Sequence, residues 1–325
     1  MKDNKPFFSI VIPLYNKAHT IENTLNTVLA QKFTDFEVVL VDDGSTDDGV
    51  DLIYSVFRDQ RIKVISQENQ GVSAARNFGV KRSISRYIAF LDADDEWMPN
   101  YLTEMYSAIE SFPNGGMFCS AGIVKNGDGT ESLRIASNLQ GSIGPIDFFQ
   151  NPHVFLHTSA TVVLKSEFWK TGGFPVGMKR NEDFALFFSL ALITTVIYCG
   201  LPLSIYVGGV LGQATSISIN SNLNHVVDRY NFVTENWLKL DCRNPTYKIF
   251  LKYELRHEII TYLRDNNYSS IELIMNGLDS RIKGLFSNFE LQLYRDARFK
   301  SIATFFILLT KVRWRIRGFP VVGNK

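Results

Sequence analysis

The sequence predicts an α/β protein with a doubly wound, mostly parallel sheet, followed by a helical C-terminal region. Short β-rich runs recur at residues 7–13, 36–42 and 87–92, with a weaker run at 61–66. Each run is followed by a helical pattern, and strands that alternate with helices favour parallel pairing. Ligands of such sheets bind beyond the carboxyl ends of the strands, so we expect the functional residues there.

Hydrophobic periodicity supports each predicted element in turn. Residues 20–31 place Ile21, Leu25, Val28 and Leu29 on one helical face, and 50–57 and 72–83 carry further helices. Residues 117–124 predict a strand, 126–129 a turn, and 154–164 a buried strand before a short helix. From about Leu223 the composition becomes helical. We therefore expect a domain built on the sheet at 1–220 and a helical region at 221–325.

A long apolar stretch at residues 185–201 could be mistaken for a membrane span. It belongs to a segment without any Asp, Glu, Lys or Arg between Asp183 and Asp228, and it breaks at Gly200-Leu201-Pro202. Its length is only at the lower limit for spanning a bilayer. A buried helix followed by a strand fits better. The polar N-terminus leads directly into the first strand and shows no signal-peptide pattern.

Charge and cysteine content narrow the function classes. The 34 basic and 33 acidic residues give a net charge of +1, so no global field favours nucleic acid as a partner. Cys119, Cys199 and Cys242 lack metal-ligand spacing and suggest reduced thiols in the cytoplasm. The five histidines form no metal-ligand group, and we interpret His153 and His157 as loop or strand residues. The chain contains neither a Walker loop nor a Gly-x-Gly-x-x-Gly fingerprint.

Two acidic clusters close predicted strands. Asp42-Asp43-Gly44-Ser45 could be a simple strand-to-helix turn with a capping serine, but adjacent carboxylates at a buried strand end repel unless a cation or ligand donors offset them. Asp92-Ala93-Asp94-Asp95-Glu96 could be a solvated loop. At the mouth of a parallel sheet it is also a hard-cation site, because carboxylates and diphosphate oxygens suit Mg²⁺ or Mn²⁺.

Two further elements carry candidate residues. Gly71 precedes a predicted helix with Arg76 in its second turn, which is either a surface arginine or a diphosphate contact. Glu182 and Asp183 begin another helix, where the helix dipole alone could favour acids. They also precede the charge-free segment, so one carboxylate at the edge of an apolar core could be tuned as a general base.

Taken together, these motifs resemble family 2 glycosyltransferases with the GT-A fold. The resemblance lies in Val11-Ile12-Pro13-Leu14-Tyr15-Asn16, Val41-Asp42-Asp43-Gly44-Ser45, Asn69-Gln70-Gly71 with Ala75-Arg76-Asn77, Leu91-Asp92-Ala93-Asp94-Asp95, and Glu182-Asp183. They occur in the family's order over residues 7–209. The resemblance implies a metal-dependent inverting transfer of a hexose-type sugar from a UDP-sugar to a hydroxyl of a saccharide or lipid-linked saccharide, in polysaccharide or glycolipid assembly.

The resemblance also implies a role for each site residue. Pro13, Tyr15 and Asp43 would line the pocket of the nucleotide base, and Arg76 would approach that base or the diphosphate. Asp92 would bind the ribose beside Ala93, and Asp94 would bind Mn²⁺ or Mg²⁺. Asp183 would be the catalytic base. One feature departs from the family. Residues 206–218 lack the Arg or His that often contacts the diphosphate after the base helix.

The C-terminal region leaves two interpretations open. Ile302, Phe305, Phe306, Leu309, Val312 and Ile316 form one stripe flanked by Lys311, Arg313, Arg315 and Arg317. Such a helix either docks on the protein or contacts the cytoplasmic face of the inner membrane peripherally, and the region could also form homo-oligomer contacts.

Two other functions compete with sugar transfer. Nucleotidyl transfer normally needs a glycine-rich basic loop after the first strand, which Leu14-Tyr15-Asn16-Lys17 does not provide. A noncatalytic binding module descended from a transferase would not need Asp94 and Asp183, and both are present.

Overall fold

A computed structural model describes residues 5–135, 137–151, 156–210, 223–240 and 244–316. The chain divides into two compact units. Unit 1 comprises Met1–Ile146 and Val154–Ile217, and unit 2 comprises Asp147–His153 and Ser218–Lys325. The unit 2 helices come from the sequence segment that lacks strand-like alternation.

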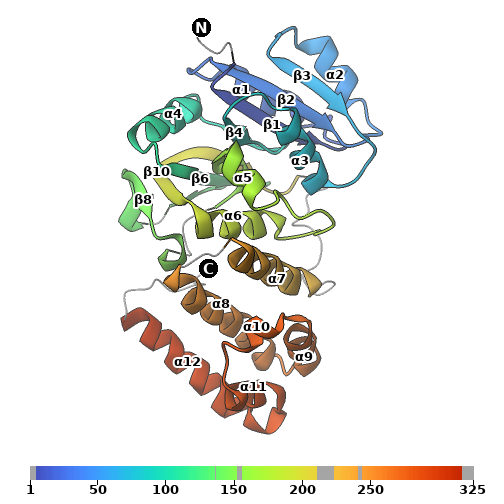
Figure 1. Cartoon of the computed structure of the whole chain (residues 1–325). Helices are drawn as coiled ribbons and strands as arrows, with labels where there is room; N and C mark the ends of the chain where they lie inside the picture. Colours follow the sequence, from blue (N-terminus) through green and yellow to red (C-terminus); the bar gives the residue numbers. More distant parts are fainter. Residues whose placement is uncertain (1–4, 136, 152–155, 211–222, 241–243, 317–325) are drawn as a thin grey trace. The chain divides into compact units, whose positions relative to one another are not determined.

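Unit 1 is built on a ten-stranded sheet in the order β3-β2-β1-β4-β9-β6-β10-β5, with β7 paired to β6 and β8 paired to β10. Figure 1 shows β1, β2 and β3 side by side in the N-terminal part of the chain. The strands are β1 (Phe8–Leu14), β2 (Phe36–Asp42), β3 (Ile62–Ser66), β4 (Tyr87–Phe90), β5 (Glu96–Trp97), β6 (Gly115–Lys125), β7 (Glu131–Arg134), β8 (Ile143–Ile146), β9 (Thr161–Leu164) and β10 (Thr195–Val207).

The sheet is mostly parallel, and the predicted fold class is confirmed. β1 pairs in parallel with β2 and β4, β2 with β3, and β6 with β10. β9 runs antiparallel between β4 and β6. Because β1, β2 and β4 run in the same direction, their carboxyl ends lie at one edge of the sheet, where the acidic clusters follow.

Helices cover this sheet and contribute its core. They are α1 (Ile21–Leu29), α2 (Gly49–Val56), α3 (Val72–Arg82), α4 (Tyr101–Ser111), α5 (Lys165–Lys170) and α6 (Glu182–Ile193). Helix α3 packs on β1 and β2 through small residues. A Cβ at Gly79 would overlap the Val11 side chain, so glycine permits this close approach. That packing fixes the position of Arg76 on α3 relative to the strand ends.

The apolar stretch forms a buried helix and a strand, as predicted, but the predicted break at Gly200-Leu201-Pro202 is wrong. β10 continues through these residues with shifts in its register against β6. Gly200 exchanges backbone hydrogen bonds with Gly141 and Ser142, and a Cβ there would overlap the Leu139 carbonyl oxygen. The glycine therefore admits a neighbouring segment instead of ending the strand. Among the described residues, no helix has both the length and the apolarity needed to cross a membrane.

The predicted strand at residues 154–164 is also partly wrong. Residues 154 and 155 lie outside the described part of the chain, Thr158–Ala160 forms a 3₁₀ turn (η3), and only Thr161–Leu164 is a strand. The Ser159 carbonyl accepts a hydrogen bond from Trp97 Nε1 at 2.6 Å, and its hydroxyl accepts one from the Asp92 backbone N–H at 3.0 Å. In the 3₁₀ turn, both the carbonyl and the side chain of Ser159 face the loop after β4, and these two hydrogen bonds stabilise that conformation.

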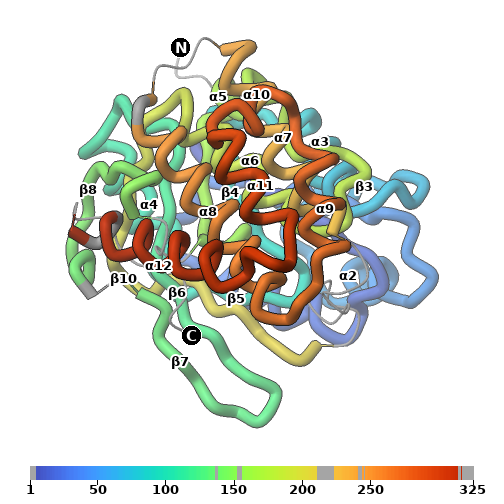
Figure 2. The backbone as a smooth tube through the Cα atoms, turned by 90° about the horizontal axis from the view of Figure 1, so that it is seen from below, coloured from blue at the N-terminus to red at the C-terminus, as the bar shows by residue number. Residues whose placement is uncertain are grey.

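Unit 2 is helical, with its own core. Its helices are α7 (Asn224–Lys239), α8 (Pro245–Arg264), α9 (Tyr268–Gly277), α10 (Ser280–Lys283), α11 (Asn288–Arg295) and α12 (Lys300–Ile316). Tyr230, Tyr247 and Phe250 are fully buried or nearly so, and Phe149 of this unit packs on Tyr247 with ring centroids 5.2 Å apart. Figure 2 shows α12 running beside α8 and α11.

Candidate active site

The loop after β2 holds its carboxylates with neutral donors. Asp43 Oδ1 accepts hydrogen bonds from Gln67 Nε2 at 2.7 Å and from the Gln70 N–H at 3.0 Å, and Oδ2 accepts one from the Gly71 N–H at 2.8 Å. Its side chain is buried. Gly71 has a φ of 88° and immediately precedes α3. Asp43 thus joins the end of β2 to the start of α3 and remains a fixed hydrogen-bond acceptor.

The end of β1 lies beside this loop. Leu14 pairs with Asp42 across the parallel strands, and the Asp43 N–H donates to the Leu14 carbonyl. Pro13 is half-buried in β1, and Tyr15 is exposed just after it. Asn16 has a φ of 51° and accepts a hydrogen bond from the Thr46 N–H. Pro13, Tyr15 and Asp43 therefore follow neighbouring strand ends, and the ring of Tyr15 is accessible.

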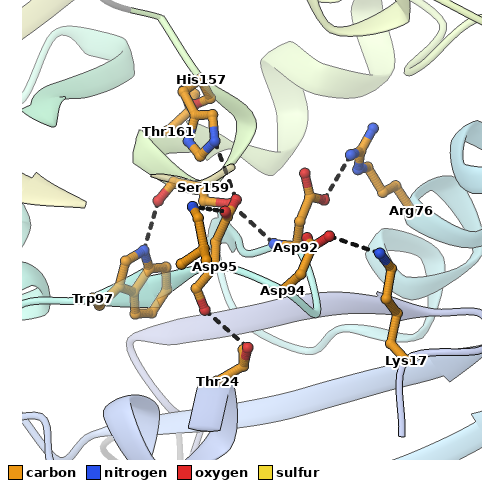
Figure 3. A network of polar contacts seen from close by, with 11 residues as sticks. Lys17, Thr24, Arg76, Asp92, Asp94, Asp95, Trp97, His157, Ser159 and Thr161 are labelled. Carbon is orange, nitrogen blue, oxygen red and sulfur yellow. Dashed lines mark hydrogen bonds and ion pairs between the residues drawn. The ribbon is translucent and has the colours of Figure 1, made fainter. Parts of the chain in front are cut away.

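Arg76 bridges two acidic segments that are far apart in sequence. Its Nη2 donates to Asp92 Oδ1 at 2.6 Å, and its Nη1 contacts Glu182 Oε1 at 3.1 Å. The guanidinium side chain is only 4% exposed and lies 5.0 Å from the Phe174 ring centroid. Burial disfavours its charge, but Asp92 and Glu182 more than compensate and raise its pKa. Figure 3 shows the contact of Arg76 with Asp92. Through its two contacts, Arg76 ties the loop after β4 to the start of α6.

Asp94 is paired with a lysine from the turn after β1. Lys17 Nζ lies 2.8 Å from Asp94 Oδ2, and both side chains are largely buried. Figure 3 shows the two side chains facing each other. Burial raises the pKa of Asp94, the nearby charges of Asp95 and Asp92 raise it further, and Lys17 opposes these effects. Crowded carboxylates of this kind gain from an additional cation.

Asp95 anchors the same loop to the protein interior. Its side chain is 1% exposed, its Oδ2 accepts a hydrogen bond from Ser159 Oγ at 2.5 Å, and its carbonyl accepts one from Thr24 Oγ1 at 2.9 Å. His157 Nε2 lies 3.1 Å from Asp95 Oδ2. Burial lowers the pKa of His157 and is the largest single influence. The charge and hydrogen bonding of Asp95, together with the charges of Asp92 and Asp183, outweigh it, so the net shift is upward.

His157 is the residue near this loop that sequence reasoning missed. It is separated from Asp95 by sixty-two positions in sequence and belongs to no recognisable motif. A single histidine in a stretch interpreted as a strand carries no signal that distinguishes it. Its imidazole also packs edge-on against Tyr206, with ring centroids 5.2 Å apart. His153, the other histidine considered, lies outside the described residues.

Asp183 stands in the first turn of α6. Its Oδ1 accepts a hydrogen bond from the Phe184 N–H at 2.7 Å. Burial, together with the charge of neighbouring Glu182, raises the pKa of Asp183 to about 6, although the Phe184 N–H and Arg76 oppose the shift. A carboxylate with this pKa is ionised at neutral pH and still basic enough to accept a proton from a reacting hydroxyl.

The acidic loop suits a hard cation without forming a complete protein cage. Asp92 Oδ1 and Asp94 Oδ2 each bind a protein cation, whereas the second oxygen of each accepts no hydrogen bond from the described residues. No cluster of three His, Cys, Asp or Glu side chains that could hold a metal occurs in the described part of the chain. Oxygens of a bound diphosphate would have to complete the coordination. Ala93 is buried in the core cluster, so only its backbone could contact a ligand.

Comparison with known proteins decides the family. The family model described as "Glycosyl transferase family 2" matches residues 9–171, which include both acidic strand ends and Arg76. The chain belongs to this family. Membership of this family is what the motifs predicted, and enzymes of the family generally use a divalent metal.

Individual relatives of the chain add detail. It is 29% identical over 227 residues to the uncharacterized glycosyltransferase RC0461 of Rickettsia conorii, and the match covers 69% of this chain but only 35% of that protein. TuaG of Bacillus subtilis, whose name assigns it provisionally to teichuronic acid biosynthesis, is 40% identical over 104 residues, covering 31% of this chain and 41% of TuaG.

A solved structure confirms the fold of the chain over most of its length. The crystal structure of Staphylococcus aureus TarS residues 1–349 in complex with UDP-GlcNAc superposes with a TM-score of 0.70 and 17% identity, covering 94% of this chain and 91% of that one. At that identity the likeness shows the GT-A type fold alone.

The segment 206–218, which lacks the Arg or His expected to contact the diphosphate, is described only in part, because residues 211–218 lie outside the described residues.

Proposed function

We propose that this glycosyltransferase moves a hexose-type sugar from a UDP-sugar to a hydroxyl acceptor with inversion, assisted by Mn²⁺ or Mg²⁺. The observation that carries the proposal is the link through Arg76, which holds Asp92 of the strand-end loop and Glu182, the neighbour of Asp183, on one guanidinium. A donor-binding carboxylate and a tuned base are thereby kept near each other.

The donor would lie along the carboxyl ends of β1, β2 and β4. We assign Pro13, Tyr15 and Asp43 to the base, because Asp43 Oδ2 accepts only one hydrogen bond from the described residues and has a lone pair for an imide N–H. Asp92 Oδ2 would accept from ribose hydroxyls, beside the backbone of Ala93. The neighbouring TarS structures, which contain UDP-GlcNAc or UDP, support a UDP-sugar donor.

Asp94 is assigned to the metal. When bound, Mn²⁺ or Mg²⁺ would offset charge that develops on the leaving diphosphate. Lys17, which pairs with Asp94, adds positive charge on the same side of the loop. A contact of Arg76 with base or diphosphate stays a prediction. Its buried guanidinium, bound to two carboxylates, supports a positioning role besides.

Asp183 is the proposed catalytic base. Its carboxylate would take the proton of the acceptor hydroxyl while that oxygen forms a bond to the anomeric carbon and the bond to the UDP oxygen breaks. Attack from the face opposite UDP inverts the anomeric configuration. The proton ends on Asp183 and the electron pair on the diphosphate.

The acceptor proposed is a saccharide or a lipid-linked saccharide, in polysaccharide or glycolipid assembly. The provisional name of TuaG supports a polysaccharide context. The buried free thiols of Cys119 and Cys199 support a reducing, cytoplasmic setting, and a lipid-linked acceptor would bring the enzyme to the cytoplasmic face of a membrane. Cys242 lies outside the described residues.

A nucleotide-sugar panel tests this function. UDP release is measured with Mn²⁺ or Mg²⁺ and a range of saccharide acceptors for the wild type, Asp94→Ala and Asp183→Asn. We expect Asp94→Ala to lose metal-dependent donor binding, and Asp183→Asn to bind donor without transferring sugar. Asp51→Asn is the matched control, since Asp51 is also an acid in a first helical turn but is exposed on α2. Full transfer by Asp183→Asn would refute the base assignment.

A further inference from the structure

Helix α12 presents an apolar stripe to solvent within unit 2. The stripe residues, spaced alternately three and four apart, are 50–80% exposed and consist of Ile302, Phe305, Leu309, Val312 and Ile316. Leu308, beside them, is 42% exposed. Five large apolar side chains on one exposed helical face form a continuous patch of the kind that marks an interaction surface.

The stripe takes no part in the packing of unit 2. Ala303 and Ile307 are fully buried, and they lie on the opposite side of α12, which packs against α8 and α11. Phe306, which the sequence placed in the stripe, is half-buried near the Arg256 guanidinium and belongs to the packed side. The helix therefore has two apolar faces. One docks on the protein, as the first interpretation of the sequence expected, and the other remains for a partner.

Charge decides which partner fits the stripe. Every charged residue within α12 is basic, namely Lys300, Lys311, Arg313 and Arg315. Arg313 is exposed beside the stripe. Pairing the stripe with a second copy of itself would bring basic residues together without any acid of α12 to neutralise them. Anionic headgroups complement such a helix, and the apolar stripe can enter the boundary of the acyl chains.

We propose that the outward face of α12 binds the surface of an anionic phospholipid bilayer. The 17-residue helix would lie in the plane of the interface, with the stripe toward the acyl chains and Arg313 at the headgroups. The surface includes none of the residues assigned to donor or base. Lipid binding and sugar transfer can therefore fail independently.

Vesicle sedimentation of the full chain tests this proposal. Vesicles of phosphatidylglycerol and phosphatidylcholine in equal parts should carry the protein down, and vesicles of phosphatidylcholine alone should carry much less. The double variant Phe305→Ser/Leu309→Ser should reduce the partition coefficient roughly tenfold or more, because two interfacial side chains are lost. Arg313→Gln/Arg315→Gln should reduce it about fivefold for each charge, and only on anionic vesicles.

Controls separate lipid binding from misfolding and from self-association. The variant Leu133→Ser/Val176→Ser removes two exposed apolar side chains of unit 1 and should bind vesicles as the wild type does. Unchanged UDP release toward a saccharide acceptor in the absence of vesicles shows that the α12 variants fold. Equal binding of wild type and Phe305→Ser/Leu309→Ser to anionic vesicles would overturn the proposal. So would an oligomer in sedimentation equilibrium that this variant converts to a monomer while vesicle binding stays unchanged.

Discussion

The two acidic loops after β2 and β4 look alike in sequence and are held in opposite ways. In the first, Asp43 is surrounded by neutral amide and backbone donors. In the second, Asp92 and Asp94 pair with Arg76 and Lys17, and Asp95 lies against His157. Both loops begin at the end of a buried parallel strand of the same sheet.

This difference indicates which kind of ligand group each loop can bind. Neutral donors fix the orientation of Asp43, so that loop offers a rigid acceptor to an uncharged group. In the second loop, positive charge from side chains balances clustered carboxylates, and a metal ion could change that balance without moving the backbone. This difference supports the proposal that the first loop recognises the base and the second loop the diphosphate.

Removing Arg76 should produce the largest effect. Arg76→Met leaves Asp92 and Glu182 without their common cation, and breaking a buried ion pair in this way costs about 3–5 kcal/mol of folding stability. Denaturant unfolding measures this loss. Arg61→Met is the control, because Arg61 pairs with Asp59 at the surface and should cost about 1 kcal/mol or less. Equal losses in the two variants would contradict the bridging role.

The acidity of Asp183, whose neighbour Glu182 is linked to the second loop through Arg76, should make sugar transfer sensitive to pH. With a pKa of about 6, the base is progressively protonated below that pH, so transfer at saturating donor should fall about tenfold per pH unit. The folding stability should instead increase as the pH falls. A carboxyl whose pKa rises from 3.8 to about 6 on folding favours the folded state at low pH, and this contribution is lost as pH increases between those values. A flat rate profile from pH 7 to pH 5 would argue against Asp183 as the base.

Much of the fold was predictable from periodicity alone. The helix beginning near residue 21 matches the structure because its buried apolar residues follow the helical period. The strand at 36–42 matches because it is a short apolar run that is buried along its whole length. The helix beginning near residue 72 also matches, although the face it buries consists mostly of small residues. The course of β10 was not predictable. Gly200 and Pro202 normally end elements, and only the approach of Leu139 explains why the strand continues.

The candidate site was predictable as a set of strand-end acids but not as a network. Arg76 and Glu182 are 106 positions apart, and no spacing rule indicates their contact. The sequence also could not show that Lys17 pairs with Asp94 or that Ser159 turns toward Asp92. These contacts depend on how β1, β4 and β9 assemble, which is a property of the whole sheet.

Changing the first loop should have a smaller effect than removing Arg76. In Asp43→Asn, one carboxylate oxygen becomes an NH₂ group that faces either the Gly71 N–H or the donors from residues 67 and 70. A hydrogen-bond donor that faces another donor in a buried site costs about 1–3 kcal/mol of folding stability. UDP binding by calorimetry should weaken, and metal dependence should remain unchanged. Loss of metal dependence in this variant would break the distinction between the two loops.

Replacing His157, which contacts Asp95 of the second loop, should have the smallest effect. Ser159 also donates to Asp95 Oδ2, so His157→Leu removes one of the two partners that this oxygen has among the described residues. The loss should cost about 1 kcal/mol of stability. His157→Gln can still donate to Asp95 and should restore most of the loss. If His157 positions Asp94 through Asp95, the leucine variant should raise the metal concentration needed for half-maximal rate and leave the rate at saturating metal nearly unchanged. A lower rate at saturating metal, not rescued by glutamine, would instead place His157 in contact with the reacting groups.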